Sequence, residues 1–159
     1  MTGALKQGAA ETSELQKVSE LLGGAKLLAA SPKDALDAHD LIARGLPASA
    51  LDHLVGRLII IDKTDSLEKA VGMSLRTYQR RKDAPAKPLS QEQSGRAWKF
   101  AEILTKATAV FGSQAEAERW LESPAIGLDQ RRPLDLLSTP AGVELVEDHL
   151  ARLEYGVYA

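Results

Sequence analysis

Hydrophobic positions recur three or four residues apart in a series of segments that helix-capping residues separate. This spacing places apolar side chains on one face of an α-helix, whereas a half-buried strand would show strict alternation. Starts of predicted helices are marked by Ser13, Ser31-Pro32, Pro47, Ser90, Ser113, Pro133 and Thr139-Pro140. The pattern therefore predicts an all-α protein.

One stretch departs from this spacing. Residues 58–61 (Leu-Ile-Ile-Ile) form a run typical of a strand. Because the run is short and isolated, we interpret it as the buried end of the helix that begins at Pro47. Residues 1–12 are small and polar, and we interpret them as a flexible N-terminal tail.

Proline residues at positions 85 and 88 mark the strongest internal break. We therefore expect a helical region over residues 13–88, which contains a helix-turn-helix at 64–82, and a C-terminal domain over 89–159.

Composition narrows the possible chemistry. The 159 residues are 44% hydrophobic but only 4% aromatic, and cysteine is absent, which rules out disulfides and thiolate metal sites. His39, His53 and His149 lack the spacing of metal ligands, and no glycine loop or nucleophile motif is visible. We therefore expect no metal, no cofactor and no enzymatic activity.

The sequence also carries no apolar run of about 20 residues and no signal-peptide layout, so we expect no membrane association and a cytoplasmic location. Trp98, Phe111 and Trp120 lie on apolar stripes and are expected in the core.

The net charge of −2 conceals an uneven distribution. Residues 57–99 carry 10 basic and 5 acidic side chains, whereas residues 1–56 carry 5 and 7 and residues 100–159 carry 5 and 10. A basic centre suits phosphate binding, which depends on the local face rather than on the total charge. The alternative is that the charges cluster by chance.

The basic centre contains the helix-turn-helix pattern. Gly72 stands at the predicted sharp turn, which suits a residue free to adopt a positive φ, and Ser74 can cap the second helix. The positions predicted to face inward are Leu67, Ala70, Val71, Met73 and Tyr78. Glu68 departs from the pattern, because a small residue commonly follows the first leucine of such hairpins.

The second helix of this hairpin is the candidate DNA reader. Arg and Gln side chains can hydrogen-bond to guanine and adenine edges in the major groove, while further basic residues hold phosphates. The candidate DNA-binding residues are Ser74, Arg76, Thr77, Gln79, Arg80 and Arg81, with Lys82 and Lys87 as phosphate contacts. The alternative is an ordinary helical hairpin with a solvated basic face.

The C-terminal part resembles a known family. The resemblance covers about residues 94–159 and rests on an ordered set of motifs, which are Phe111-Gly112, Trp120-Leu121, Pro133-Leu134-Asp135-Leu136-Leu137 and Tyr155-Gly156. This stretch is similar to the Xre/MbcA/ParS toxin-binding domain. The stretch Leu67–Arg81 resembles the Xre-like helix-turn-helix that precedes that domain in the antitoxins.

The resemblance implies an antitoxin that pairs with a RES-domain toxin. Such toxins are similar to ADP-ribosyl-transferring enzymes, and they deplete cellular NAD. The resemblance also implies a homodimer that binds the toxin directly and represses its own operon. Family antitoxins can place their C-terminal end at the entrance of the toxin's active site. The toxin-binding residues implied here are Tyr155, Gly156, Val157, Tyr158 and Ala159.

The residues themselves agree with an interface at this end. Tyrosine combines a flat apolar ring with a hydroxyl group and is favoured at interfaces, and the acidic excess of residues 100–159 could complement a basic toxin surface. The alternative is that Tyr155 and Tyr158 fold back onto the chain's own core. Two other functions stay open: a transcriptional regulator with a C-terminal dimerisation domain and no toxin, or an interaction module that has lost DNA binding.

Overall fold

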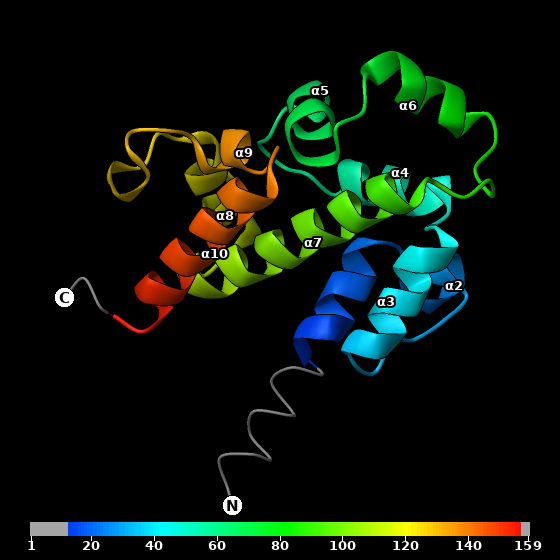
Figure 1. The fold of residues 1–159 in the computed structure, drawn as a ribbon, viewed down its shortest axis with the longest axis horizontal. Coiled ribbons are helices and arrows are strands. Elements are labelled where there is room, and N and C mark those ends of the chain that lie inside the picture. The colour runs from blue at the N-terminus through cyan, green and yellow to red at the C-terminus, as the bar shows by residue number, and fades with distance from the viewer. Residues whose placement is uncertain (1–12, 157–159) are drawn as a thin grey trace, which may run out of the picture. The chain divides into compact units, whose positions relative to one another are not determined.

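The computed structural model describes residues 13–156 as helices joined by turns (Figure 1). No β-strand occurs within this range, which contains only two isolated backbone bridges, Pro47 with Pro88 and Ala125 with Arg131. The prediction of an all-α protein is confirmed.

The helices divide into two compact units. Within the described range, unit 1 comprises residues 13–57 and 79–102, and unit 2 comprises residues 58–78 and 103–156. Helices α6 (Leu75–Lys82) and α7 (Gln91–Phe111) each contribute to both units. The domain boundary expected at residues 88 and 89 stays a prediction.

Unit 1 opens with a helix over residues 13–21. It continues with α2 (Gly24–Leu28), α3 (Ala35–Arg44), α4 (Ala48–Gly56) and the first part of α7. Its core includes the fully buried side chains of Leu22, Leu46, Leu51, Leu54 and Phe100. The Ser94 hydroxyl, on α7, accepts the backbone N–H of Leu46 at 2.8 Å and so fixes the turn before α4.

Two helix starts in unit 1 test the capping predictions. Helix α3 begins at Ala35, where the Asp34 carboxylate accepts the N–H of Asp37 at 2.9 Å. The start predicted at Ser31-Pro32 is therefore wrong, because Asp34 supplies an equally suitable cap one turn later. The helix start predicted at Ser90 is confirmed, since Ser90 and Gln93 exchange hydrogen bonds of 3.0 and 3.2 Å in a capping box at the start of α7.

The proline-rich segment over residues 83–88 is fixed within unit 1. The N–H of Ala48 donates to the Lys87 carbonyl at 3.1 Å, and the N–H of Leu89 donates to the Leu46 carbonyl at 2.8 Å. These bonds attach the segment to the start of α4, so it does not act as a free linker.

Unit 2 begins with the non-helical residues 58–61. After them come α5 (Lys63–Ser66), the π-helical turn η1 (Leu67–Val71), the first turn of α6, the second part of α7, α8 (Gln114–Glu122), the 3₁₀ turn η2 (Ile126–Leu128), α9 (Pro133–Leu136) and α10 (Pro140–Glu154). Helix α9 contacts η1, α8 and α10, and η2 contacts α10. The fully buried residues of this unit include Leu67, Leu104, Leu121, Leu134 and Leu150.

The local predictions for unit 2 have mixed outcomes. Ser113 and Thr139 cap α8 and α10 as predicted, through bonds of 3.2 and 3.0 Å. The interpretation of residues 58–61 as a buried helix end is wrong. Helix α4 ends at Gly56, and Ile59 is 63% exposed while Ile61 is 5% exposed.

The aromatic residues pack as expected only in part. Trp98 is buried in unit 1. In unit 2, Phe111 and Trp120 are half-buried, with their ring centroids 5.3 Å apart. Trp120 also stacks on His149, so the three rings join the end of α7 to α8 and α10.

Candidate functional site

The predicted helix-turn-helix consists of α5 with η1, a turn at Gly72, and α6. Gly72 has a φ of +74°, a conformation that glycine adopts without steric cost. The five positions predicted to face inward are each at most 2% exposed, namely Leu67, Ala70, Val71, Met73 and Tyr78. The inner face of the hairpin is therefore confirmed.

Ser74 and Tyr78 fix the first turn of α6. The Ser74 hydroxyl accepts the Thr77 N–H at 3.1 Å, as predicted for an N-cap, and also donates to the Thr77 hydroxyl at 3.0 Å. The Lys63 ammonium lies 4.9 Å from the centroid of the Tyr78 ring, in a cation–π contact that connects α5 with α6.

The predicted DNA-binding side chains lie along α6 and its cap. Arg76, Gln79 and Arg80 are exposed, as is Ser74, whereas Thr77 and Arg81 are half-buried. Arg76 and Arg80 lie one helical turn apart, so they share a face. The first turn of α6 has no acidic residue and its last turn has three basic ones. This arrangement suits a polyanion, and the individual DNA contacts stay predictions.

Lys82, which was predicted to contact phosphate, and Glu68, which departs from the helix-turn-helix pattern, both lie near these side chains in the sequence. Lys82 forms an ion pair with Asp52 in unit 1, at 3.7 Å, with both side chains about half exposed. Glu68 is exposed, so its carboxylate does not enter the interior of the hairpin despite its unusual position.

A buried carboxylate holds the chain that leads into the hairpin. Glu118, on α8, is 0% exposed. Its Oε1 accepts the backbone N–H groups of Ile59, Ile60 and Ile61 at 2.9, 2.8 and 3.0 Å. Its Oε2 accepts the Ile59 N–H at 3.0 Å and the Gln114 side-chain amide at 2.8 Å. Successive N–H groups that converge on one anion satisfy a charge that burial alone would disfavour.

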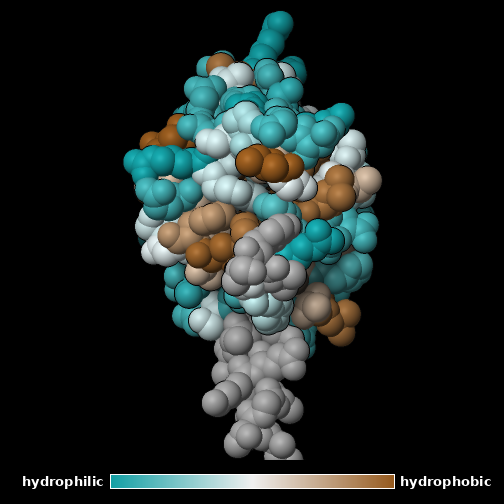
Figure 2. All heavy atoms as spheres, turned by 90° about the vertical axis from the view of Figure 1, so that its left-hand side faces the viewer, coloured by the Kyte–Doolittle hydropathy of each residue, from teal (hydrophilic) through white to brown (hydrophobic). Residues whose placement is uncertain are grey.

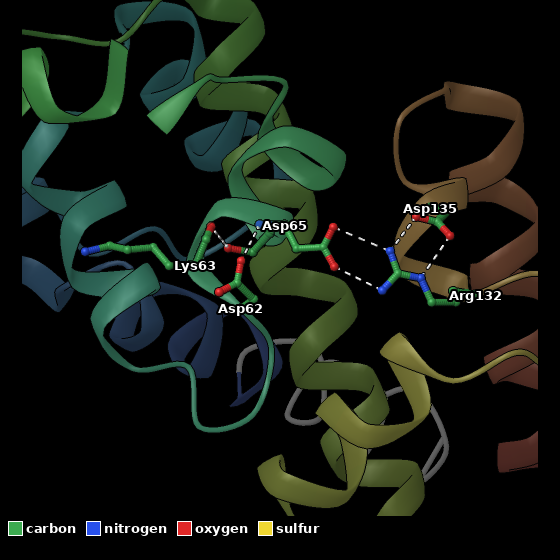
Figure 3. Close-up of polar contacts among 6 residues, drawn as sticks. Asp62, Lys63, Asp65, Arg132 and Asp135 are labelled. Carbon is green, nitrogen blue, oxygen red and sulfur yellow. Dashed lines mark hydrogen bonds and ion pairs between the residues drawn. The ribbon is translucent and has the colours of Figure 1, made fainter. Parts of the chain in front are cut away.

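Arg132 makes a second connection to the hairpin (Figure 3). Its Nη1 lies 3.0 Å from Asp65 of α5, while its Nε and Nη2 lie 2.9 and 2.8 Å from the two carboxylate oxygens of Asp135 on α9. The hydrogen bonds to Asp135, and then those to Asp65, raise the pKa of Arg132. The hydrogen bond from Arg132 lowers the pKa of Asp135. Arg132 thus holds the first helix of the hairpin against α9.

The sequence predictions did not include Glu118 or Arg132. Glu118 lies 57 to 59 residues from its backbone partners. Because it binds backbone groups, the side chains of its partners do not indicate the contact. One signal was available: Glu118 falls between Ala117 and Leu121 on the buried face of α8, where an acidic residue is unusual.

The predicted toxin-binding residues follow the end of α10. Tyr155 is 79% exposed and Gly156 has a φ of +67°. Because its ring faces solvent, Tyr155 does not pack on the chain's own core. Val157, Tyr158 and Ala159 lie outside the described residues.

Two further hydrophobic side chains of unit 2 are exposed. Ile126 is 85% and Leu145 is 54% exposed. On the face that Figure 2 draws, hydrophobic residues occur in several separate places among hydrophilic ones. Between residues 13 and 156, no helix is long and apolar enough to cross a membrane, and no cluster of His, Asp and Glu could hold a metal ion.

Two family models match the chain in succession. Residues 37–102 match the antitoxin Xre-like helix-turn-helix domain. Residues 106–156 match the antitoxin Xre/MbcA/ParS C-terminal toxin-binding domain.

Similar whole proteins carry antitoxin names. Antitoxin Xre of Yersinia enterocolitica is 31% identical over 130 residues, which cover 72% of this chain and 87% of that protein. Antitoxin Xre of Pseudomonas putida is 30% identical over 118 residues, which cover 74% of this chain and 71% of that protein. The Prs ADP-ribosylating antitoxin of a Sphingobium species is 28% identical over 142 residues, with 84% and 86% covered.

Proposed function

Since this chain belongs to the Xre family of antitoxins, we propose that it neutralises a partner toxin by direct binding and represses its own operon. The observation that carries the proposal is the succession of two domains in one chain. The first is a helix-turn-helix domain with exposed Arg76 and Arg80, and the second is a toxin-binding domain whose helix α10 leads to the exposed Tyr155. The chain acts by binding rather than by catalysis.

We further propose that the toxin is a RES-domain protein that depletes NAD. The support is the resemblance of residues 94–159 to antitoxins that pair with such toxins. A similarity to a protein named as a Prs ADP-ribosylating antitoxin supports a partner with related chemistry. Since operator DNA and NAD both occur in the cytoplasm, we place the activity there.

At the toxin, residues 155–159 occupy the entrance of the active site. An exposed tyrosine at the end of a long helix supports this role, because it offers an apolar ring and a hydroxyl group that the chain itself leaves uncovered. The acidic excess of residues 100–159 steers association with a basic surface on the toxin.

At the operator, α6 enters the major groove. Arg76 and Gln79 read base edges, Arg80 and Arg81 hold phosphates, and Ser74 and Thr77 lie at the helix start, which faces the backbone of the DNA. A homodimer places two such helices on two half-sites. The exposure of Arg76, Gln79 and Arg80 supports this role.

Co-expression tests the toxin half of the proposal. A RES-like toxin encoded beside this gene is induced alone and together with the full-length chain, and growth and cellular NAD are measured. We expect the chain to restore both. A gel-shift assay with the DNA upstream of the gene tests repression. DNA binding without rescue from a demonstrably active toxin would instead indicate a regulator that has no toxin partner.

A further inference from the structure

We propose that Glu118 and Arg132, two residues of the toxin-binding domain, position the DNA-binding hairpin, so that operator recognition depends on the toxin-binding domain. This inference rests on the proposed function of α6 as the DNA reader. It concerns residues that touch the hairpin and not the DNA.

The hairpin shares a compact unit with the toxin-binding domain. Residues 58–78 cluster with residues 103–156, although the helix-turn-helix match runs from 37 to 102. The segment 58–78 includes α5, η1, the turn at Gly72 and the first turn of α6, with Arg76 on it. The part of α6 nearest its N-terminus is thus built on the toxin-binding domain.

Glu118 fixes the point where the hairpin begins. Three successive N–H groups, those of Ile59, Ile60 and Ile61, donate to its carboxylate at 2.8–3.0 Å, which leaves this backbone little freedom. Asp62 follows directly and caps α5, since its carboxylate accepts the N–H of Asp65 at 3.1 Å. A displacement of α8 at Glu118 therefore displaces the start of α5.

Arg132 fixes the next point along the same helix. Its guanidinium bridges Asp65 on α5 and Asp135 on α9, with nitrogen–oxygen distances of 3.0 and 2.8 Å (Figure 3). Because Arg132 binds both carboxylate oxygens of Asp135, the contact fixes the orientation of the guanidinium group as well as its distance from α9. Together with Glu118, which binds residues 59–61 just before α5, it attaches the start of the hairpin to the toxin-binding domain at two places.

The position of α5 is transmitted to α6 through short contacts around the turn. The N–H of Met73 donates to the Leu67 carbonyl at 3.0 Å across the turn, and Met73 and Tyr78 are each 2% exposed. Lys63 of α5 lies over the Tyr78 ring. Since base recognition requires well-fixed side chains, a loosened α5 misplaces Arg76.

The chemistry of Glu118 also favours a positioning role. An apolar side chain would fill this buried site on α8 without the cost of desolvating a carboxylate. A carboxylate that accepts three backbone N–H groups instead specifies one path for residues 59–61.

The test compares Glu118→Gln with Glu116→Gln, the same substitution two residues away on the exposed face of α8. Both full-length variants and the wild type are examined for amide hydrogen exchange and for affinity toward two duplexes. One duplex is the DNA immediately upstream of the gene, and the other is its scrambled sequence. Rescue from the toxin is scored in parallel.

We expect Glu118→Gln to speed amide exchange at residues 59–61 and 74–78 at least tenfold. It should weaken binding to the upstream duplex at least tenfold and leave the scrambled duplex within twofold, because all basic residues remain. Toxin rescue should persist, and Glu116→Gln should match the wild type throughout.

The proposal would be overturned if Glu118→Gln exchanged the amide hydrogens of residues 74–78 at the wild-type rate, or if it bound the upstream duplex with wild-type affinity. If the wild type does not distinguish the two duplexes, the proposal that the chain represses its own operon is wrong. The exchange measurement then still decides whether Glu118 positions α6. If Glu118→Gln does not fold, Arg132→Lys and Asp65→Asn decide the question in the same assays, because both side chains are partly exposed and the substitutions keep polar groups there.

Discussion

The imidazole of His149 lies flat against the indole of Trp120, with ring centroids 5.8 Å apart and planes 4° from parallel. On another side the imidazole contacts the loop that contains η2, where a Cβ atom on Gly127 would lie 2.3 Å from His149 Cε1. His149 therefore connects α8, α10 and this loop. Burial, with a smaller contribution from Arg152, lowers the pKa of His149.

This lowered pKa makes stability dependent on pH. The unfolded chain takes up a proton at His149 near the ordinary value of 6.5, whereas the folded chain resists it, so stability falls as the pH drops from 6.5 through the folded pKa. Urea unfolding between pH 8 and pH 5 measures the effect. In His149→Asn, the part of the pH dependence of the free energy of unfolding that comes from His149 should disappear. If the free energy of unfolding changed with pH in the variant as it does in the wild type, His149 would not be the source.

Gly142 allows α9 and α10 to approach closely. A Cβ atom there would lie 1.9 Å from the carbonyl oxygen of Leu136, a backbone atom that cannot move aside alone. Overpacking of this kind costs about 1–3 kcal/mol, and we expect Gly142→Ala to reach at least the upper part of that range. Chemical denaturation provides the measurement.

The matched control for that variant is Gly95→Ala. Gly95 lies within α7, and an added Cβ atom would meet Ile42 at an ordinary 3.7 Å. Alanine is favoured over glycine inside a helix by about 1 kcal/mol, so this variant should be more stable than the wild type. Equal destabilisation by both alanines would contradict the steric explanation.

The double variant Arg76→Ala, Arg80→Ala tests α6 as the DNA reader. Loss of one good bidentate base contact costs about 1–3 kcal/mol, and each lost phosphate contact lowers the slope of log affinity against log salt by about 0.9. Gel-shift titrations at several salt concentrations measure both quantities. Toxin rescue should be unaffected, and Arg119→Ala on α8 serves as a control. An unchanged operator affinity would remove α6 as the reader.

Deletion of residues 155–159 tests the tail. We expect weaker toxin neutralisation but an unchanged thermal midpoint, because Tyr155 is exposed and contributes little to the core. Growth rescue and inhibition of purified toxin measure neutralisation, and thermal unfolding measures the midpoint. Ile126→Ser, which alters an exposed hydrophobic residue outside the tail, is the control. Full neutralisation by the truncated chain would show that the tail is dispensable.

Local chemistry accounts for what could be predicted from the sequence. Helical spacing and caps such as Ser90, Ser113 and Thr139 act within one turn, so they are visible in the chain itself, as is the turn at Gly72. Two errors also have local causes. Competing caps moved the start of α3 from Ser31-Pro32 to Ala35. Hydrophobicity at residues 58–61 suggested a buried helix end, whereas α4 ends at Gly56 and Ile59 is exposed.

The rest depends on contacts between distant segments. The acceptor role of Glu118 requires α8 to pack beside residues 59–61, and the bridge from Arg132 to Asp65 spans 67 residues. The neighbours of Glu118 indicate only that an acidic residue lies on a buried helix face, and no neighbouring residue identifies the partner in either contact. The family resemblance supplied the functional expectation, while the positioning residues emerged only from the assembled unit.

The hydrogen bonds at Glu118 have an evolutionary consequence. At residues 59–61 its partners are main-chain amides, so the side chains at these positions can be exchanged without altering the bonds, and Ile59 is already 63% exposed. Substitutions at these positions are therefore not coupled to substitutions at 118. Methods that infer contacts from correlated changes between columns of an alignment would therefore miss the contacts between Glu118 and residues 59–61.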